Sequence, residues 1–300
     1  MARTIAAIVI GKQMKTMILY KYLKYERKDI LESGLIRFTQ PKNFNDPFEA
    51  LPNVKYIFSA EFVSGIIRIL SDKKQLNSFV NKLNSENSKR IFQELYFTYQ
   101  ESNSAEKELM INRLLGDSEE NLSKSIQSYW NDQIGILSLS EENDNLTMWS
   151  HYADEHKGFA IGFNPKKITD LKSQFMQLRK MHYSCIRPKL SLFELEQSKE
   201  ERNKKWLNAF LLTKSKDWAY ENEWRQINYL KYATKTLESN GQQIKLFKYN
   251  PESIESIYLG CKMPPENKKR IVDLTRNLNI RIYEMGIDKK NYCLEKIRIK

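Results

Sequence analysis

Cysteine is scarce in this chain, and its few copies lie far apart. The 300 residues contain only Cys185, Cys261 and Cys293, and no two of them form a CxxC pair. An odd number of widely separated cysteines argues against a disulfide framework and against a zinc knuckle. The composition therefore favours a reducing compartment, and we expect a cytoplasmic protein.

Long apolar runs are missing as well. The first apolar run covers only Ile5 to Ile10, which is too short to span a membrane, and no later segment approaches the required length. We therefore expect no membrane partner. We expect residues 1–17 to be a leader without defined structure, with Met14 and Met17 as alternative natural first residues.

Dense runs of basic residues are also absent, although the chain as a whole is basic. Lys and Arg outnumber Asp and Glu by 49 to 37, which gives a formal net charge of +12. Such an excess favours association with polyanions such as nucleic acid, nucleotides or an anionic membrane surface. The alternative explanation is a Lys-rich proteome, because Lys, Asn and Ile are abundant throughout the chain.

The chain does contain enough apolar residues, 41% of the total, to fill a substantial core. The hydrophobic period is helical from about residue 59 to 131 and changes abruptly at both edges of that block. We therefore expect residues 18–300 to form a single α+β domain, with a central mixed or antiparallel sheet and residues 59–131 as a helical insertion. The expected strands include 18–23, 134–140, 157–163 and 218–230, and the expected helices include 146–156 and 198–216.

The segment WAYENEWRQINYL, residues 218–230, alternates aromatic and charged side chains. Successive side chains of a strand point to opposite faces, so the two classes would be separated. We predict that the aromatic face packs in the core and that the charged face lines a pocket, where Arg225 orients a carboxylate. The aromatic residues are Trp218, Tyr220 and Trp224, and the charged ones are Glu221, Glu223 and Arg225. The alternative is a surface ion pair on an edge strand.

Three further polar clusters fall at expected turns or strand ends. They are Asn45, Asp46 and Glu49 in FNDPFE, Ser138 and Ser140 in LSLS, and Trp149, His151, Tyr152 and His156 in MWSHYADEH. We predict that these clusters and the glutamates line one pocket. Each cluster also has a purely structural interpretation. The first would be a simple turn, the two serines would be ordinary strand residues, and Trp149 and Tyr152 would belong to the core. His151 and His156 are five residues apart, which does not match a zinc-binding pair on one helical face, and we expect no metal site from them.

The words FNDPFE, MWSHYADEHKGFAIGF and KSKDWAYENEWR, in this order, resemble a widespread bacterial family of domains of unknown function, family 2971. The resemblance runs from about residue 18 to the C-terminus and is interrupted by the helical block. The family name implies no activity.

A second resemblance is to ADP-ribosyltransferases, which have an NAD-contacting first strand, a middle strand with Ser or Tyr, and a late strand with an ExE motif. It implies a catalytic group of Glu223, Glu221, Tyr152 and His151. It implies NAD contacts by Lys21, Tyr20, Ser138, Ser140, Trp149, Arg225, Asp46 and Glu49. The first strand departs from this layout, because residues 18–25 contain neither Arg nor His.

Three functions follow as hypotheses. The first is an ADP-ribosyltransferase-like enzyme that uses NAD to modify nucleic acid or protein, in a phage-defence or mobile-element setting. The second is a metal-dependent nuclease or hydrolase with Asp46, Glu49, Glu221 and Glu223 as oxygen ligands, which a chelator would inhibit. The third is a non-catalytic module that binds nucleic acid in a salt-dependent way. The substrate, the modified target, the oligomeric state and the presence of any catalysis stay open.

Overall fold

Two compact units make up the chain. A computed structural model describes residues 17–50, 60–83, 85–168, 178–188, 207–239 and 241–300. The first unit comprises Met1–Asn45, Asn131–Tyr183 and Lys214–Lys300, and the second comprises Asp46–Trp130 and Ser184–Thr213. Helices and strands are both abundant, so the predicted α+β class is confirmed, whereas the single-domain assignment stays a prediction. No helix in the described parts is long and apolar enough to cross a membrane.

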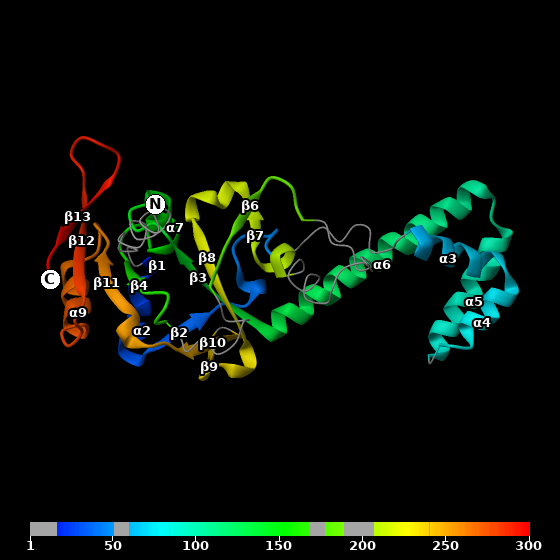
Figure 1. Ribbon diagram of the computed structural model, residues 1–300, viewed down its shortest axis with the longest axis horizontal. Helices are drawn as coiled ribbons and strands as arrows, with labels where there is room; N and C mark the ends of the chain where they lie inside the picture. Colours follow the sequence, from blue (N-terminus) through cyan, green and yellow to red (C-terminus); the bar gives the residue numbers. More distant parts are fainter. Residues whose placement is uncertain (1–16, 51–59, 84, 169–177, 189–206, 240) are drawn as a thin grey trace, which may run out of the picture. The chain divides into compact units, whose positions relative to one another are not determined.

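The first unit is built on an eight-stranded sheet with the order β13-β12-β11-β4-β1-β3-β8-β5 (Figure 1). Its strands are β1 (Leu19–Leu23), β3 (Ile134–Ser140), β4 (Phe159–Phe163), β5 (Arg179–Lys180), β8 (Glu223–Tyr229), β11 (Ile254–Leu259), β12 (Arg281–Ile287) and β13 (Leu294–Arg298). The β11–β12 pair is parallel and the other pairs are antiparallel. The predicted mixed sheet is therefore confirmed.

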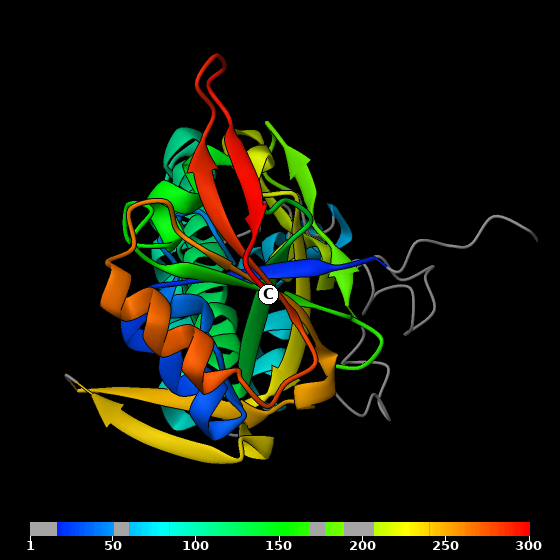
Figure 2. The same ribbon diagram turned by 90° about the vertical axis from the view of Figure 1, so that its left-hand side faces the viewer.

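Both faces of this sheet are covered, as the sequence of β1 requires. Its residues alternate between two apolar clusters, with Leu19 and Leu23 in one and Tyr20 and Tyr22 beside the other. Helices α2 (Asp29–Ser33) and α9 (Pro265–Leu274) contribute Ile30 and Ile271 to the first cluster. Figure 2 shows α9 in orange beside α2 in blue, and an Arg270–Glu32 ion pair of 3.2 Å joins them.

The other face of the sheet is covered by α7 (Leu146–Tyr152), which carries the MWSHY part of the longest motif. Asn145 caps its first turn by accepting a hydrogen bond from the Met148 amide. Met148 and Trp149 pack against Tyr22 of β1 in the second apolar cluster. The helix is thereby fixed above the middle of the sheet, and its last residue, Tyr152, is held in place.

A smaller sheet, in the order β2-β10-β9, adjoins the start of β3. It consists of β2 (Leu35–Phe38), β9 (Lys235–Ser239) and β10 (Gln242–Lys248), and a bridge between Thr39 and Ile136 connects it to β3. Short 3-10 turns complete this unit: η1 (Tyr25–Lys28), η2 (Pro41–Asn43), η4 (Lys216–Glu221), η5 (Leu230–Tyr232) and η6 (Pro251–Ser253). Strands β6 (His182–Ser184) and β7 (Thr213–Ser215) form a two-stranded sheet.

The second unit is mainly helical, as the periodicity of residues 59–131 predicts. It contains α3 (Ala60–Ser71), α4 (Lys73–Val80), α5 (Glu86–Glu101) and most of α6 (Ser104–Gln133). Asp72 and Ser85 cap α4 and α5 with their side-chain oxygens. Ile66, Leu70, Tyr99 and Ile111 form the buried centre of this unit.

The expected helix 146–156 is wrong in its second half. Asp154, Glu155 and His156 have φ values of +49°, +51° and +72°, so the chain takes a left-handed path after α7. Strand β4 begins at Phe159, two residues later than expected. The amide of Gly158 donates to the Ala153 carbonyl at 2.7 Å, which closes this loop.

The expected strand 218–230 is wrong at its start. Residues 216–221 form the 3-10 turn η4, and Asn222 has a φ of +42°, so β8 begins only at Glu223. The expected helix 198–216 is confirmed only at residues 207–211; residues 213–215 form β7, and 198–206 lie outside the described parts. The expected leader, residues 1–17, lies outside them except for Met17. Strand β9 was not expected.

Gly158 is required by close packing, and its replacement tests the loop. A Cβ atom there would lie 2.1 Å from the Leu23 carbonyl oxygen and 2.9 Å from that of Ala153. We expect Gly158→Ala to lower the free energy of unfolding by about 3 kcal/mol, because backbone atoms must shift. Chemical denaturation of the two proteins measures the change.

Gly116 provides the matched control, since nothing lies within 4 Å of a Cβ atom placed on it in α6. Gly116→Ala should raise the free energy of unfolding by about 0.5–1 kcal/mol through helix propensity. If the wild type and Gly158→Ala were equally stable, the loop would accommodate a Cβ atom at residue 158, and the close packing inferred here would be wrong.

Candidate functional site

The turn from η4 into β8 directs two glutamates into the protein. Glu221 is the last residue of η4 and Glu223 is the first residue of β8. The left-handed conformation of Asn222 between them turns both side chains to the same side. The side chains are nearly excluded from water: Glu221 is 3% exposed, Glu223 4% and Arg225 1%. The charged side chains are more deeply buried than Trp218, Tyr220 and Trp224, which are only half-buried, although Trp224 and Tyr220 pack against the apolar clusters as predicted.

Two cations hold these carboxylates. Arg225 donates from Nε and Nη2 to the two oxygens of Glu223, at 2.7 and 3.1 Å, in a bidentate pair. Lys214 of β7 donates to Glu221 at 2.8 Å, and its Nζ lies 3.8 Å from Glu223. Two acidic and two basic groups cancel in formal charge, which lowers the cost of removing them from water.

Aromatic rings cover the two cations. The ammonium of Lys214 lies 4.5 Å from the ring centre of Trp218, and the guanidinium of Arg225 lies 5.1 Å from that of Phe44. Burial disfavours the ammonium of Lys214, but Glu223 and Glu221 outweigh burial and raise its pKa. Lys214 therefore stays charged at neutral pH.

Tyr152 connects the buried glutamates to the surface. Its hydroxyl, at the end of α7, donates to Glu221 at 2.5 Å and accepts from Asn45 at 3.2 Å. Burial and the Glu221 carboxylate raise the pKa of Tyr152, so the hydroxyl keeps its proton at neutral pH. Asn45 is exposed, and Tyr152 thus lies between a solvent-facing rim and the carboxylates.

His151 belongs to the same rim. Its Nδ1 lies 3.1 Å from the hydroxyl of Tyr220, and the two rings are nearly perpendicular. His151 is exposed and Tyr220 is half-buried. The structure therefore brings His151 close to the catalytic candidates, but on their outer side.

The first strand contributes Lys21, which approaches the network from β1. Its Nζ donates to the Ser138 carbonyl at 3.0 Å. Burial lowers the pKa of Lys21 to about 8, and the Glu223 carboxylate opposes part of this fall. Tyr20 points elsewhere: its ring contacts Tyr258 of β11 at 5.6 Å, in the second apolar cluster.

The two serines of β3 have different roles. The Ser140 hydroxyl donates to the Glu221 carbonyl at 2.7 Å and accepts from the Glu142 amide at 3.0 Å, which fastens η4 to the end of β3. The Ser138 side chain donates a hydrogen bond to Glu223 that favours its charged form and opposes the rise in its pKa. Ser140 therefore positions the backbone, whereas Ser138 contacts the carboxylate.

Trp149 is fully enclosed. Its exposed fraction is 0%, its Nε1 donates to the Asn143 carbonyl at 2.9 Å, and its ring contacts Tyr22 edge-on at 5.3 Å. On the other side the ring of His156 stacks at 6.3 Å. These contacts match the core reading of Trp149 and leave no open ring face for a ligand.

Asp46 and Glu49 belong to the second unit. Asp46 accepts a hydrogen bond from the Phe48 amide at 2.9 Å, and the Glu49 amide donates to the Asp46 carbonyl at 3.1 Å. This is the turn chemistry of an Asn-Asp-Pro sequence. No group of three or more His, Cys, Asp or Glu side chains that could hold a metal ion occurs among the described residues.

Three contributors were missed in the sequence. Lys214 is the first residue of the KSKDWAYENEWR motif, so the motif itself could have indicated that Lys214 lies near the glutamates. Phe44 likewise begins FNDPFE. Tyr183, whose hydroxyl accepts a hydrogen bond from the Glu223 amide at 2.8 Å, had no signal, because it lies in a segment without a motif.

Glu223 combines these influences. Burial raises its pKa to about 7, Glu221 adds to the rise, and Lys214, Ser138 and Lys21 oppose it. A carboxyl group with a pKa near 7 can accept and release a proton at neutral pH. The arrangement thus provides a proton acceptor at Glu223 beside a second carboxylate that Tyr152 and Lys214 hold.

The raised pKa of Glu223 makes stability depend on pH. In the unfolded chain the carboxyl group loses its proton near the ordinary glutamate pKa of 4.5, while in the folded protein it keeps the proton to about 7. Folding therefore takes up a proton between these values, and this contribution to stability falls as pH rises, by at most about 1.4 kcal/mol per pH unit. Relative to Glu223→Gln, the wild type should lose unfolding free energy from pH 4.5 to 7 and then change no further.

Denaturant titrations at several pH values test this expectation. Glu238→Gln, on the exposed strand β9, is the matched control and should follow the wild type. If the wild type and Glu223→Gln gave parallel curves over this range, Glu223 would ionise in the folded protein as it does in the unfolded chain.

The comparisons with known proteins agree with the motifs. Neither the curated proteins nor the solved structures gave a match. Residues 148–226 match the family described as "Protein of unknown function (DUF2971)". The matched span includes α7, β4, Lys214 and the Glu221–Arg225 segment. The predicted resemblance to family DUF2971 is therefore confirmed over residues 148–226.

Proposed function

We propose that the protein is an ADP-ribosyltransferase-like enzyme that breaks the nicotinamide–ribose bond of NAD at Glu221 and Glu223. The observation that supports this most is the network of Tyr152, Glu221, Lys214, Glu223 and Arg225. It holds two carboxylates side by side in a nearly dry site and connects one of them to an exposed rim. The ExE spacing of the ADP-ribosyltransferase resemblance falls on these two glutamates.

The chemistry needs a buried negative charge. When the C1′–N bond of NAD breaks, the bonding electrons pass to the nicotinamide nitrogen, which becomes neutral, and the ribose develops oxocarbenium character. A carboxylate in a site of low dielectric stabilises that positive charge more than water does. A hydroxyl or amine of the acceptor then forms the new bond to C1′ and gives its proton to a base.

Glu223 is assigned to the base because of its pKa near 7. Arg225 and Lys214 keep a share of its population ionised and fix its position. Glu221 is assigned to the ribose, because Tyr152 holds its Oε1 on the side of the rim. Replacement of the Tyr152 hydroxyl by a ribose hydroxyl would preserve the hydrogen bond to Glu221.

The rim offers a place for the nicotinamide. Tyr220 and Tyr152 are both half-buried, so each has part of its ring available for stacking. Lys21 and Arg225, which the resemblance assigns to NAD, are engaged with the Ser138 carbonyl and with Glu223. In the proposed enzyme Lys21 therefore holds the backbone of β3 and Arg225 holds Glu223, and neither binds the diphosphate.

A metal-dependent hydrolase fits this part of the molecule less well. A divalent cation prefers several free carboxylate oxygens, and here Lys214 and Arg225 already lie against Glu221 and Glu223. Two cationic side chains would repel an added metal ion. The chelator test still separates the two functions, since NAD cleavage at these glutamates requires no metal.

Release of nicotinamide from NAD, followed by chromatography, tests the proposal. We expect turnover by the wild type and a loss of about 100- to 1,000-fold in Glu223→Gln, which keeps the shape of the side chain but not its charge. Tyr152→Phe should lower turnover less, because Glu221 keeps its bond to Lys214. Each variant should be shown to be folded by its melting transition.

Glu238→Gln serves as the matched control, because it removes a carboxylate at an exposed position. It should cleave NAD at the wild-type rate. Full turnover by Glu223→Gln would remove Glu223 from the mechanism. A wild type that binds no NAD in a calorimetric titration would contradict the proposed cofactor itself.

A further inference from the structure

A polar pocket of about 510 Å³ lies in the first unit, away from the glutamates. Four segments form it: η2, the last turn of α6, η5 and the start of β10. Its lining includes Gln40, Lys42, Asp132, Lys231, Gln243 and Lys245. None of these residues belongs to the motifs discussed above.

The position of this pocket separates it from the glutamates. Tyr229 at the end of β8 pairs with Ile134 at the start of β3, and Glu223 pairs with Ser140 at the other end. Six residues of extended chain span about 20 Å. Because η5 follows Tyr229 directly and Asp132 nearly adjoins Ile134, the pocket and the glutamates lie at opposite ends of one strand pair.

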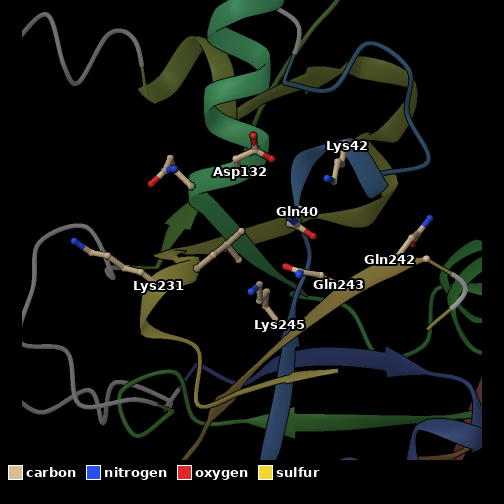
Figure 3. A pocket seen from close by; sticks show the side chains of 10 residues that line it. Gln40, Lys42, Asp132, Lys231, Gln242, Gln243 and Lys245 are labelled. Carbon is tan, nitrogen blue, oxygen red and sulfur yellow. The ribbon is translucent and has the colours of Figure 1, made fainter. Parts of the chain in front are cut away.

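The pocket is cationic. Lys42 and Lys245 give two positive charges against the single negative charge of Asp132, and Lys231 adds a third at the edge of the pocket. Figure 3 shows Lys42 and Lys245 on different walls, with Gln40 and Gln243 between them. The ammonium of Lys245 is oriented by the Thr236 hydroxyl at 3.2 Å, and the 7%-exposed Gln40 donates to the Asn131 carbonyl at 3.1 Å.

An aromatic surface continues from the rim of the pocket. Figure 3 shows the ammonium of Lys231 directed away from the other lining groups. It lies 5.0 Å from the ring centre of Tyr232 and 5.6 Å from that of Tyr229. Tyr232 is 57% exposed, so its ring can accept a stacked base.

We propose that this pocket and Tyr232 bind single-stranded nucleic acid. Lys42 and Lys245 contact one backbone phosphate, the amides of Gln40 and Gln243 contact the adjoining sugar or base edge, and Tyr232 stacks a neighbouring base. A mononucleotide would not need an exposed ring outside the pocket, whereas a strand extends across both. The proposal does not depend on NAD cleavage, because it requires only binding.

Fluorescence anisotropy of a short labelled oligothymidylate or oligouridylate, at several salt concentrations without NAD, tests the site. Lys42→Ala with Lys245→Ala should weaken binding by roughly tenfold or more and reduce the salt slope by about 0.7, as expected for one lost phosphate contact. Asp132→Asn should tighten binding, because it removes the negative charge of the pocket. Tyr232→Ala should weaken binding by roughly fivefold or more.

Matched controls come from the same chain. Lys235→Ala with Lys248→Ala removes two exposed lysines of β9 and β10 that do not line the pocket, and Tyr292→Ala removes a fully exposed ring on the β12–β13 loop. Both should bind like the wild type. Glu223→Gln should also bind normally even if it loses turnover, which separates failure of this proposal from failure of the proposed enzyme.

Three results would overturn the assignment. The first is an equal loss of affinity in both lysine pairs, which would indicate diffuse attraction by the net positive charge. The second is an acidic peptide that binds as tightly as the oligonucleotide. The third is the absence of oligonucleotide binding by the wild type at low salt.

Discussion

Lys214, Glu221, Glu223 and Arg225 share a space from which water is almost excluded, and their mutual neutralisation constrains much of the first unit. Removing either member of the Lys214–Glu221 pair would leave an uncompensated buried charge, which costs about 3–5 kcal/mol. Each of the four residues is supplied from a fixed place: β7 for Lys214, the end of η4 for Glu221, and β8 for Glu223 and Arg225. The left-handed Asn222 is the joint that brings the two glutamates to the same cations.

Neighbouring elements are arranged to satisfy the remaining polar groups of this network. Ser140 fastens the Glu221 carbonyl to β3, the Glu223 amide donates to Tyr183, and Tyr152 donates to Glu221 from α7. The left-handed loop after α7 and the close packing of Gly158 hold that helix above the sheet. A buried network that is fully hydrogen-bonded gives a unique geometry, which is useful for structure and for catalysis alike.

Sequence patterns predicted the elements whose side chains alternate in a simple way. The strands at 18–23 and 134–140 and the helical block were found because period and burial agree there. The segment 218–225 failed for a physical reason: its alternation also fits a strand, and nothing in residue type reveals that Asn222 adopts a positive φ. The depth of burial of Glu221 and Glu223 could not be predicted, because charged residues normally lie at the surface and the compensating Lys214 lies several residues upstream.

The buried network of Lys214, Glu221, Glu223 and Arg225 contributes no formal net charge to the protein. Since its two acidic and two basic groups cancel, the formal excess of +12 belongs to the other residues of the chain. Lys42 and Lys245 provide a local concentration of that excess at one end of the β3–β8 pair, while the carboxylates occupy the other end. The same separation would keep the binding charges from shifting the pKa of Glu223, because Coulomb interactions over about 20 Å are largely screened by salt.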